Sequence, residues 1–115
     1  MTIKILIVDD EPVQRRLLEA AVTRMGYACQ TVENGVQALA AFEGPGGGDI
    51  AVVVLDLVMP EMDGMTVLER MRDREIDVPV IVQTGQGGID TVISAMRAGA
   101  FDFVVKPASP DRLQT

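Results

Sequence analysis

The sequence predicts an α/β protein in which a doubly wound parallel sheet carries helices on both faces. Two observations support this fold class. Five strand-like segments alternate with helical segments along the 115 residues, and such alternation is typical of a parallel sheet with crossover helices. Three of these segments, residues 3–8, 51–55 and 78–82, are almost wholly apolar, as expected for strands that are buried on both faces.

The first strand and the first helix are separated by an acidic turn. Residues 3–8 form the strand, and residues 9–11 (Asp-Asp-Glu) follow it directly. Pro12 then occupies the first helical position, where its missing N–H leaves no hydrogen bond unmade. Gly26 ends this helix. The apolar positions that recur at helical spacing are Val13, Leu17, Leu18, Ala21 and Met25.

The second strand and the second helix are less regular. Residues 27–32 form a weaker strand, because Gln30 and Thr31 interrupt its apolar pattern. Asn34 and Gly35 turn the chain into the helix. Residues 44–48, four of which are glycine, end that helix and predict a flexible loop. The apolar positions of the helix are Val36, Leu39, Ala40 and Phe42.

The second half of the chain continues the alternation. The third strand, residues 51–55, runs into Asp56, and Asp63 is placed to cap the helix that follows it. The fourth strand, residues 78–82, precedes a helix that ends at Gly99, and the fifth strand covers residues 101–105. Residues 109–111 (Ser-Pro-Asp) predict the start of a fifth helix. Because the sequence stops at residue 115, we expect this helix to be cut short within a single domain, residues 1–115.

The polarity of the strands favours one spatial order. The first, third and fourth strands are almost wholly apolar and belong in the centre of the sheet. The second strand is mixed and Asp102 interrupts the fifth, so these two belong at the edges. The order 2-1-3-4-5 meets this requirement. It is the order of flavodoxin-like doubly wound sheets, and we take it from that class.

Composition excludes several classes of function. The net charge is −7 and no basic cluster stands out, so direct nucleic-acid binding is not expected. The chain has no histidine, which excludes imidazole catalysis and argues against a zinc site. No apolar run approaches the ~20 residues that span a bilayer, so we expect no membrane association. The lone Cys29 cannot form an intrachain disulfide, which favours a reducing, cytoplasmic location.

Five polar residues stand at or just beyond the predicted carboxyl ends of strands: Asp9, Asp10, Asp56, Thr84 and Lys106. Ligands of doubly wound sheets bind at this edge. Carboxylates at ~5 Å and an effective dielectric of about 20 repel by roughly 3 kcal/mol per pair, so three of them together need a cation. Oxygen ligands without His or Cys favour Mg²⁺, or alternatively Mn²⁺.

The same edge could hold a phosphoryl group. Lys106 offers a positive charge, Thr84 offers a hydroxyl donor, and Gly85 lets a backbone N–H come close. An aspartate such as Asp56 can carry a phosphoryl group as an acyl phosphate. Taken singly, these residues have simpler explanations as a loop-initiating Asp, a helix-capping acidic run and a solvated lysine. Their joint placement at one edge favours a phosphoryl site.

The chain resembles the receiver domain of two-component response regulators over nearly its full length. By this resemblance Asp56 accepts a phosphoryl group from a histidine kinase, and Lys106 and Thr84 contact that group. The matching segments are residues 8–11 (VDDE), 55–64 (LDLVMPEMDG), 84–85 (TG), 98–100 (AGA) and 106–107 (KP).

The resemblance also implies the metal ligands and the switch. Asp10, Asp56 and the backbone carbonyl of Val58 would ligate Mg²⁺, and Asp9 would act mainly through water. Phe103 matches the family's switch aromatic, and the bond between residues 106 and 107 is similar to one that is usually cis.

Residues 83–91 and 95–103 are similar to receivers that precede a sigma-54-type ATPase and a DNA-binding domain. The resemblance therefore implies a transcriptional output domain beyond residue 115, or a partner protein that reads the switch. It also allows a phosphorylation-dependent dimer. It implies no enzyme activity beyond the domain's own phosphorylation and dephosphorylation.

Three alternatives use a similar fold. A flavin mononucleotide-binding protein would need a hydroxyl- and glycine-rich loop after the first strand, where residues 9–11 would instead repel phosphate. A haloacid-dehalogenase-type enzyme would need a second Asp two residues after Asp56, where Val58 stands. A phosphate-independent interaction module is the third alternative, and the presence of the complete residue set argues against it.

Overall fold

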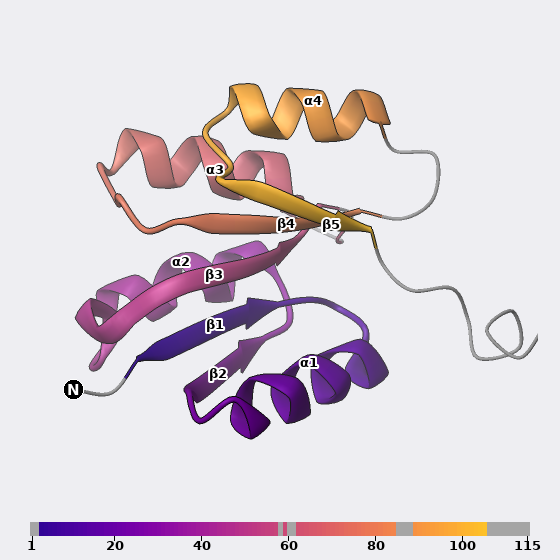
Figure 1. Ribbon diagram of the computed structural model, residues 1–115. Coiled ribbons are helices and arrows are strands. Elements are labelled where there is room, and N and C mark those ends of the chain that lie inside the picture. Colours follow the sequence, from indigo (N-terminus) through magenta and orange to yellow (C-terminus); the bar gives the residue numbers. More distant parts are fainter. Residues whose placement is uncertain (1–2, 58, 60–61, 85–88, 106–115) are drawn as a thin grey trace, which may run out of the picture.

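The computed structural model describes residues 3–57, 59, 62–84 and 89–105, with only the backbone at residues 84, 89 and 105 (Figure 1). Strands and helices alternate along the chain, as the sequence predicts. The strands are β1 (Lys4–Val8), β2 (Ala28–Val32), β3 (Ile50–Asp56), β4 (Val80–Thr84) and β5 (Asp102–Val105). The helices are α1 (Pro12–Arg24), α2 (Gly35–Glu43), α3 (Gly64–Asp73) and α4 (Ile89–Arg97), with a 3₁₀ turn, η1, at Gly47–Asp49.

All neighbouring strands are parallel, and their order is β2-β1-β3-β4-β5. The predicted fold class and strand order are confirmed. The fourth strand begins and ends two residues later than predicted. Pro79 explains the late start, because it has no N–H to donate to a neighbouring strand; its carbonyl accepts from Val53 N at 3.0 Å. As a consequence, Gln83 and Thr84 are the last residues of β4.

Helices cover both faces of the sheet (Figure 1), and an apolar layer lies between the sheet and the helices on each face. Because strand side chains alternate between faces, Leu6 and Val8 point to one layer and Ile5 and Ile7 to the other. The first layer is packed against α2, α3 and α4, and we call it the three-helix face. The second is packed against α1, and we call it the α1 face.

Helix α1 buries a narrower stripe than its sequence predicts. Leu18 packs on the α1 face beside Val22, which is buried. In contrast, Val13 and Leu17 are 68% and 57% exposed, and Met25 is also exposed. The apolar pattern is wide enough for two neighbouring stripes, and the described part of the chain covers only one of them. Similarly, the predicted apolar position Val36 of α2 is exposed, as are Ile93 and Met96 of α4.

The helix ends explain how the connections are fixed. Asp63 accepts from Thr66 N at 2.9 Å, which confirms the predicted cap of α3. Asn34 caps α2 in the same way through Gln37 N. Glu11 precedes α1 but makes no capping hydrogen bond with its side chain. The predicted flexible loop at residues 44–48 is partly ordered by η1, because Gly46 adopts a left-handed φ of 80° that starts the turn.

Several predictions fall outside the described residues. They concern the fifth helix, the bond between residues 106 and 107, Gly85, Lys106 and Val58. Within the described ranges, no helix is both long and apolar enough to cross a membrane.

Candidate functional site

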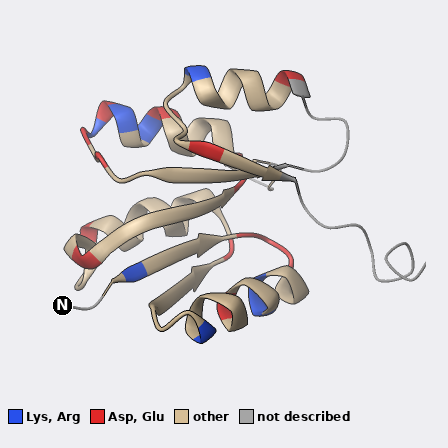
Figure 2. Ribbon diagram, in the orientation of Figure 1, with Lys and Arg blue, Asp and Glu red and all other residues tan. Residues whose placement is uncertain are grey.

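The carboxyl ends of β1, β3 and β4 lie at one edge of the sheet, where Figure 2 shows acidic residues between β1 and α1 and at the tip of β3. The strand register explains this grouping. Val8 pairs with Leu55, so Asp9 and Asp56 are the next residues along neighbouring strands. Asp56 in turn pairs with Gln83 of β4. Residues far apart in the sequence therefore meet where ligands of doubly wound sheets bind.

Asp9, Asp10 and Glu11 form a carboxylate cluster whose ligand oxygens all lie within 4.8 Å of one another. Asp9 is fully buried, whereas Asp10 and Glu11 are exposed. Asp9 Oδ1 accepts from Glu11 N at 2.9 Å, which holds the buried carboxylate against the turn. Sequence reasoning included Asp9 and Asp10 but missed Glu11 as a member. The turn brings the carboxylate of Glu11 beside those of Asp9 and Asp10, and no pattern in the sequence predicts that turn.

A half-buried arginine supports this cluster and was also missed. Arg15 Nη1 donates to the backbone carbonyl of Asp9 at 2.8 Å, and its Nη2 lies 3.6 Å from Glu33 Oε1. The Arg15 side chain is only 16% exposed. Its guanidinium therefore brings a permanent positive charge beside the acidic turn. Arg15 lies four residues after Glu11, within the first turns of α1. This spacing is the signal in the sequence that could have identified Arg15.

Asp56 is 2% exposed and ends β3. The backbone just after it is held from two sides. Leu57 N donates to the carbonyl of Gln83 at 3.2 Å, and Leu57 O accepts from Gly64 N at 3.1 Å. A Cβ at Gly64 would lie 2.6 Å from the Asp56 carbonyl oxygen, so only glycine allows α3 to start this close. The position of Asp56 is thus fixed by β4 and α3 together.

An all-oxygen donor set of this kind suits a hard divalent cation such as Mg²⁺ or Mn²⁺. The structure places Asp9 and Asp10 within the group that could hold it. That group contains Glu11 and does not include Asp56. The oxygen donors of the cluster therefore fit the predicted metal. The ligand set implied by the resemblance contains the carboxylate of Asp56, whereas the cluster contains that of Glu11.

The remaining predicted residues are placed only in part. Thr84 ends β4 and pairs with Val105, the residue before Lys106. Phe103 pairs with Val82 and is 40% exposed, so it points toward the three-helix face without being enclosed there. Its amide donates to Asp102 Oδ1 at 2.8 Å.

A glutamine pair also lies near this edge. Gln14 Nε2 donates to Gln83 Oε1 at 3.1 Å, which links α1 to the end of β4. Gln83 is 3% exposed, and it is one of three buried polar or charged residues in the described part of the chain, with Asp9 and Asp56. Sequence reasoning missed the pair, because its two residues lie 69 positions apart in the sequence.

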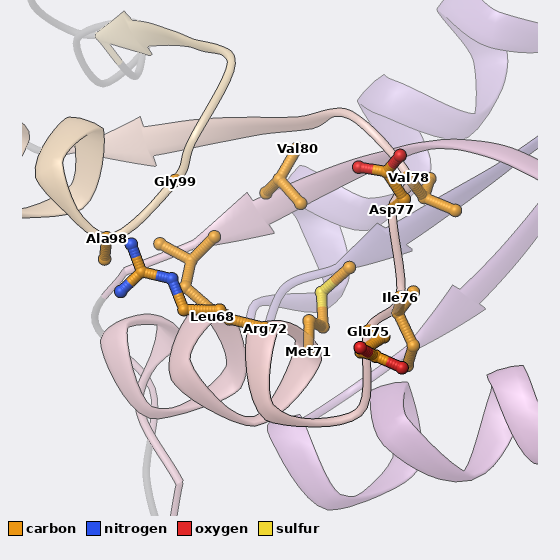
Figure 3. Close-up of a pocket in the computed structure, with 10 residues that line it drawn as sticks. All are labelled: Leu68, Met71, Arg72, Glu75, Ile76, Asp77, Val78, Val80, Ala98 and Gly99. Carbon is orange, nitrogen blue, oxygen red and sulfur yellow. The ribbon is translucent and has the colours of Figure 1, made fainter.

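A pocket of about 410 Å³ lies between α3, the α3–β4 connection and the end of α4 (Figure 3). Its apolar lining includes Leu68, Met71 and Val80, and its charged residues are Arg72, Glu75 and Asp77. It borders the start of β4, whereas the carboxylates lie at the ends of the strands. It therefore contributes no residue to the carboxylate site.

Comparisons with known proteins identify the family. The family model of the response regulator receiver domain matches residues 5–115. The chain is 43% identical over 112 residues to the regulatory protein AtoC of Escherichia coli (strain K12), covering 96% of this chain and 23% of that protein. It is 44% identical over 113 residues to the probable transcriptional regulator ycf27 of Pyropia yezoensis, covering 96% and 44%. The chain thus spans less than half the length of these relatives.

Comparison with solved structures identifies the same family. A response regulator receiver domain protein from Clostridium thermocellum superposes with a TM-score of 0.84 at 31% identity, covering 96% of this chain and 87% of that one. NtrX from Brucella abortus also gives 0.84, at 34% identity, covering 99% of this chain and 25% of that one. The chain belongs to the response regulator receiver domain family.

Proposed function

We propose that this domain is a phosphorylation-dependent switch in which Asp56 accepts a phosphoryl group from a histidine kinase. One observation carries the proposal: a buried aspartate lies at the end of β3, next in register to Asp9 of a carboxylate cluster, in a receiver domain. Family membership also favours this function over the flavin-binding and dehalogenase-type alternatives.

The transfer step is a substitution at phosphorus. An Asp56 carboxylate oxygen attacks the phosphorus of a phosphohistidine, the P–O bond forms, and the P–N bond breaks. The electron pair of that bond leaves with the imidazole, which is then protonated. The attacking oxygen starts in a fixed position, because the Leu57 backbone is hydrogen bonded to Gln83 and to Gly64.

Asp9 and Asp10 would hold Mg²⁺ or Mn²⁺, together with Asp56 and the Val58 carbonyl in the ligand set that resemblance implies. A bound cation supplies positive charge where the phosphoryl oxygens collect negative charge. Lys106 and Thr84 would contact those oxygens, and Gly85 would donate its backbone N–H. Outside this self-modification, the domain would catalyse no reaction.

The switch would run from Thr84 to Phe103. A phosphoryl oxygen accepts a charge-assisted hydrogen bond, so it would draw the Thr84 hydroxyl toward it. Phe103 lies on the neighbouring strand β5 and is only partly buried. Its rotation would change the exposed apolar surface of β5, and α4 also presents exposed apolar side chains at Ile93 and Met96, which are 46% and 39% exposed.

The readers of that surface would be an output domain, a partner protein or a second copy of the chain. Relatives named as regulatory protein and transcriptional regulator support a transcriptional output. The proposed location is the cytoplasm. By resemblance to receivers that precede sigma-54-type ATPases, we propose an output domain of that kind beyond residue 115.

Acetyl phosphate with Mg²⁺ tests this function. We expect intact-mass spectrometry to show one added phosphoryl group in the parent domain, and none when Mg²⁺ is removed by a chelator. Asp56→Asn should abolish the addition, and Asp10→Asn should slow it because a metal ligand is lost. Asp73→Asn, at the far end of α3, is the matched control and should label normally. Undiminished labelling of Asp56→Asn would falsify the assignment.

A further inference from the structure

The buried carboxamide of Gln83 joins two elements that are distant in the sequence. Gln83 is on β4 and is 3% exposed, and Gln14 is half-buried in the first turn of α1. The 3.1 Å bond between Gln14 Nε2 and Gln83 Oε1 spans 69 positions of sequence. Polar side chains this deeply buried are usually fully hydrogen bonded, and an exception needs a physical explanation.

Gln83 is such an exception. Its Nε2 is buried and has no hydrogen-bond partner among the residues that the structure describes. A buried donor left unpaired loses its hydrogen bonds to water without gaining any from the protein. This arrangement is therefore disfavoured at Gln83, and a rearrangement that gives Nε2 an acceptor is favoured.

Gln83 is also next to the residues of the proposed switch. It pairs with Asp56, its carbonyl accepts from Leu57 N, and Thr84 follows it in the same strand. Side chains alternate along a strand. Gln83 bonds to α1 on the α1 face, whereas Val82 packs on the three-helix face and pairs in register with Phe103. A displacement of the end of β4 thus reaches both faces of the sheet.

We propose that the Gln83–Gln14 bridge couples phosphorylation of Asp56 to the position of α1, as a second arm of the switch. This inference rests on the proposed function. When Thr84 moves toward the phosphoryl group, the Gln83 carboxamide moves with the same strand end. It then either shifts Gln14 or exchanges its partner, and both outcomes change α1 near the exposed Val13 and Leu17. Gln83 is a positioning residue, because it acts through the strand and the helix.

The unpaired donor supplies the difference between two states that a switch requires. In the arrangement described, one of the carboxamide's two polar atoms is bonded and the other is not. A leucine or methionine at position 83 would pack without this imbalance and would have no reason to prefer a second arrangement. The bridge is therefore more consistent with a coupling role than with stability alone.

Amide NMR with and without beryllofluoride, a phosphoryl mimic, tests the coupling. We expect the parent to show shift changes in α1, residues 12–24, and in residues 89–105. Gln83→Met keeps a similar side-chain volume. It should retain beryllofluoride binding and the changes in residues 89–105 while losing those in α1. Gln14→Met should give the same loss from the helix side, and the double variant should lose nothing further.

Gln37→Met is the control, because Gln37 is exposed on α2; it should behave as the parent does. Parental α1 changes in Gln83→Met, or equal losses in the control, would overturn the coupling. A parent that responds in residues 89–105 but not in α1 would overturn this inference alone. A parent with no response anywhere would overturn the phosphoacceptor proposal itself.

Discussion

The two faces of the sheet are built differently. Among the described residues, 18 buried side chains form one cluster on the three-helix face, which reaches from β2 to α4. The corresponding cluster of described residues on the α1 face contains Ile5, Ile7 and Val22, with half-buried neighbours such as Val54. The α1 face also carries the Gln14–Gln83 bridge and the thiol of Cys29. Within the described residues, most buried apolar side chains lie on the three-helix face, whereas the α1 face carries the polar contact between the two glutamines.

The difference in packing between the two faces suits them to two different tasks. A close-packed layer resists change, because each side chain is held by many neighbours. A layer with few buried residues and an unpaired amide is easier to rearrange. The three-helix face can therefore hold Asp56 at the end of β3, while Gln83 faces a layer that has fewer buried apolar side chains among the described residues.

The largest expected effect compares neighbouring valines of β3. Val53 is fully buried on the three-helix face, and Val54 is half-buried on the α1 face. Val53→Ala should lower the free energy of unfolding by about 2–3 kcal/mol, since two methyl groups are lost and a cavity remains. Val54→Ala should cost about 1 kcal/mol. Urea unfolding of both variants measures the difference, and equal losses would contradict the contrast between the faces.

A smaller effect compares the helix starts. Asn34 caps α2 with a side-chain hydrogen bond to Gln37 N at 2.9 Å, whereas Glu11 makes no such bond at α1. Asn34→Ala should therefore destabilise the domain by about 1 kcal/mol. We expect Glu11→Ala to change stability far less in metal-free buffer. Thermal melts of the two variants distinguish the cases, and a loss at Glu11 as large as at Asn34 would show a cap that the structure lacks.

The smallest effect concerns Cys29. Burial raises the pKa of its thiol above the ordinary value, and the nearby negative charge of Glu19 raises it further. The reactive thiolate is thus scarcer than in unfolded protein at the same pH. Iodoacetamide at pH 8 should label the native domain more slowly than the urea-unfolded chain, and the native rate should rise with pH. Glu19→Gln should speed labelling by roughly twofold or less, since burial is the larger cause. Equal native and unfolded rates would show that the α1 face is open to solvent at this point.

The sequence predicted the alternation, the fold class and the positions of Asp9, Asp10 and Asp56, because strand ends in a parallel sheet are set by local apolar patterns. It could not predict which stripe of α1 would be buried, since Val13 and Leu17 are as apolar as Leu18 and Val22. It also missed Gln83, whose burial depends on the late start of β4 after Pro79. The turn that returns Glu11 to the carboxylates depends on a hydrogen bond to Asp9, which local composition does not encode.

The strand order has a consequence for the way the chain is made. Lys4 pairs with Ala28 and also with Ile50, so β1 first gains β2 and then receives β3 on its other side. From there each strand joins the same growing edge in the order in which a ribosome delivers it. The entropy of closing each crossover rises only slowly with its length, so this sequential growth needs no rearrangement. The carboxylates of β1 and β3 meet before Thr84 arrives with β4, and the predicted phosphoryl contact Lys106 follows β5. We therefore expect the candidate site to be completed late in synthesis, after β5 is made.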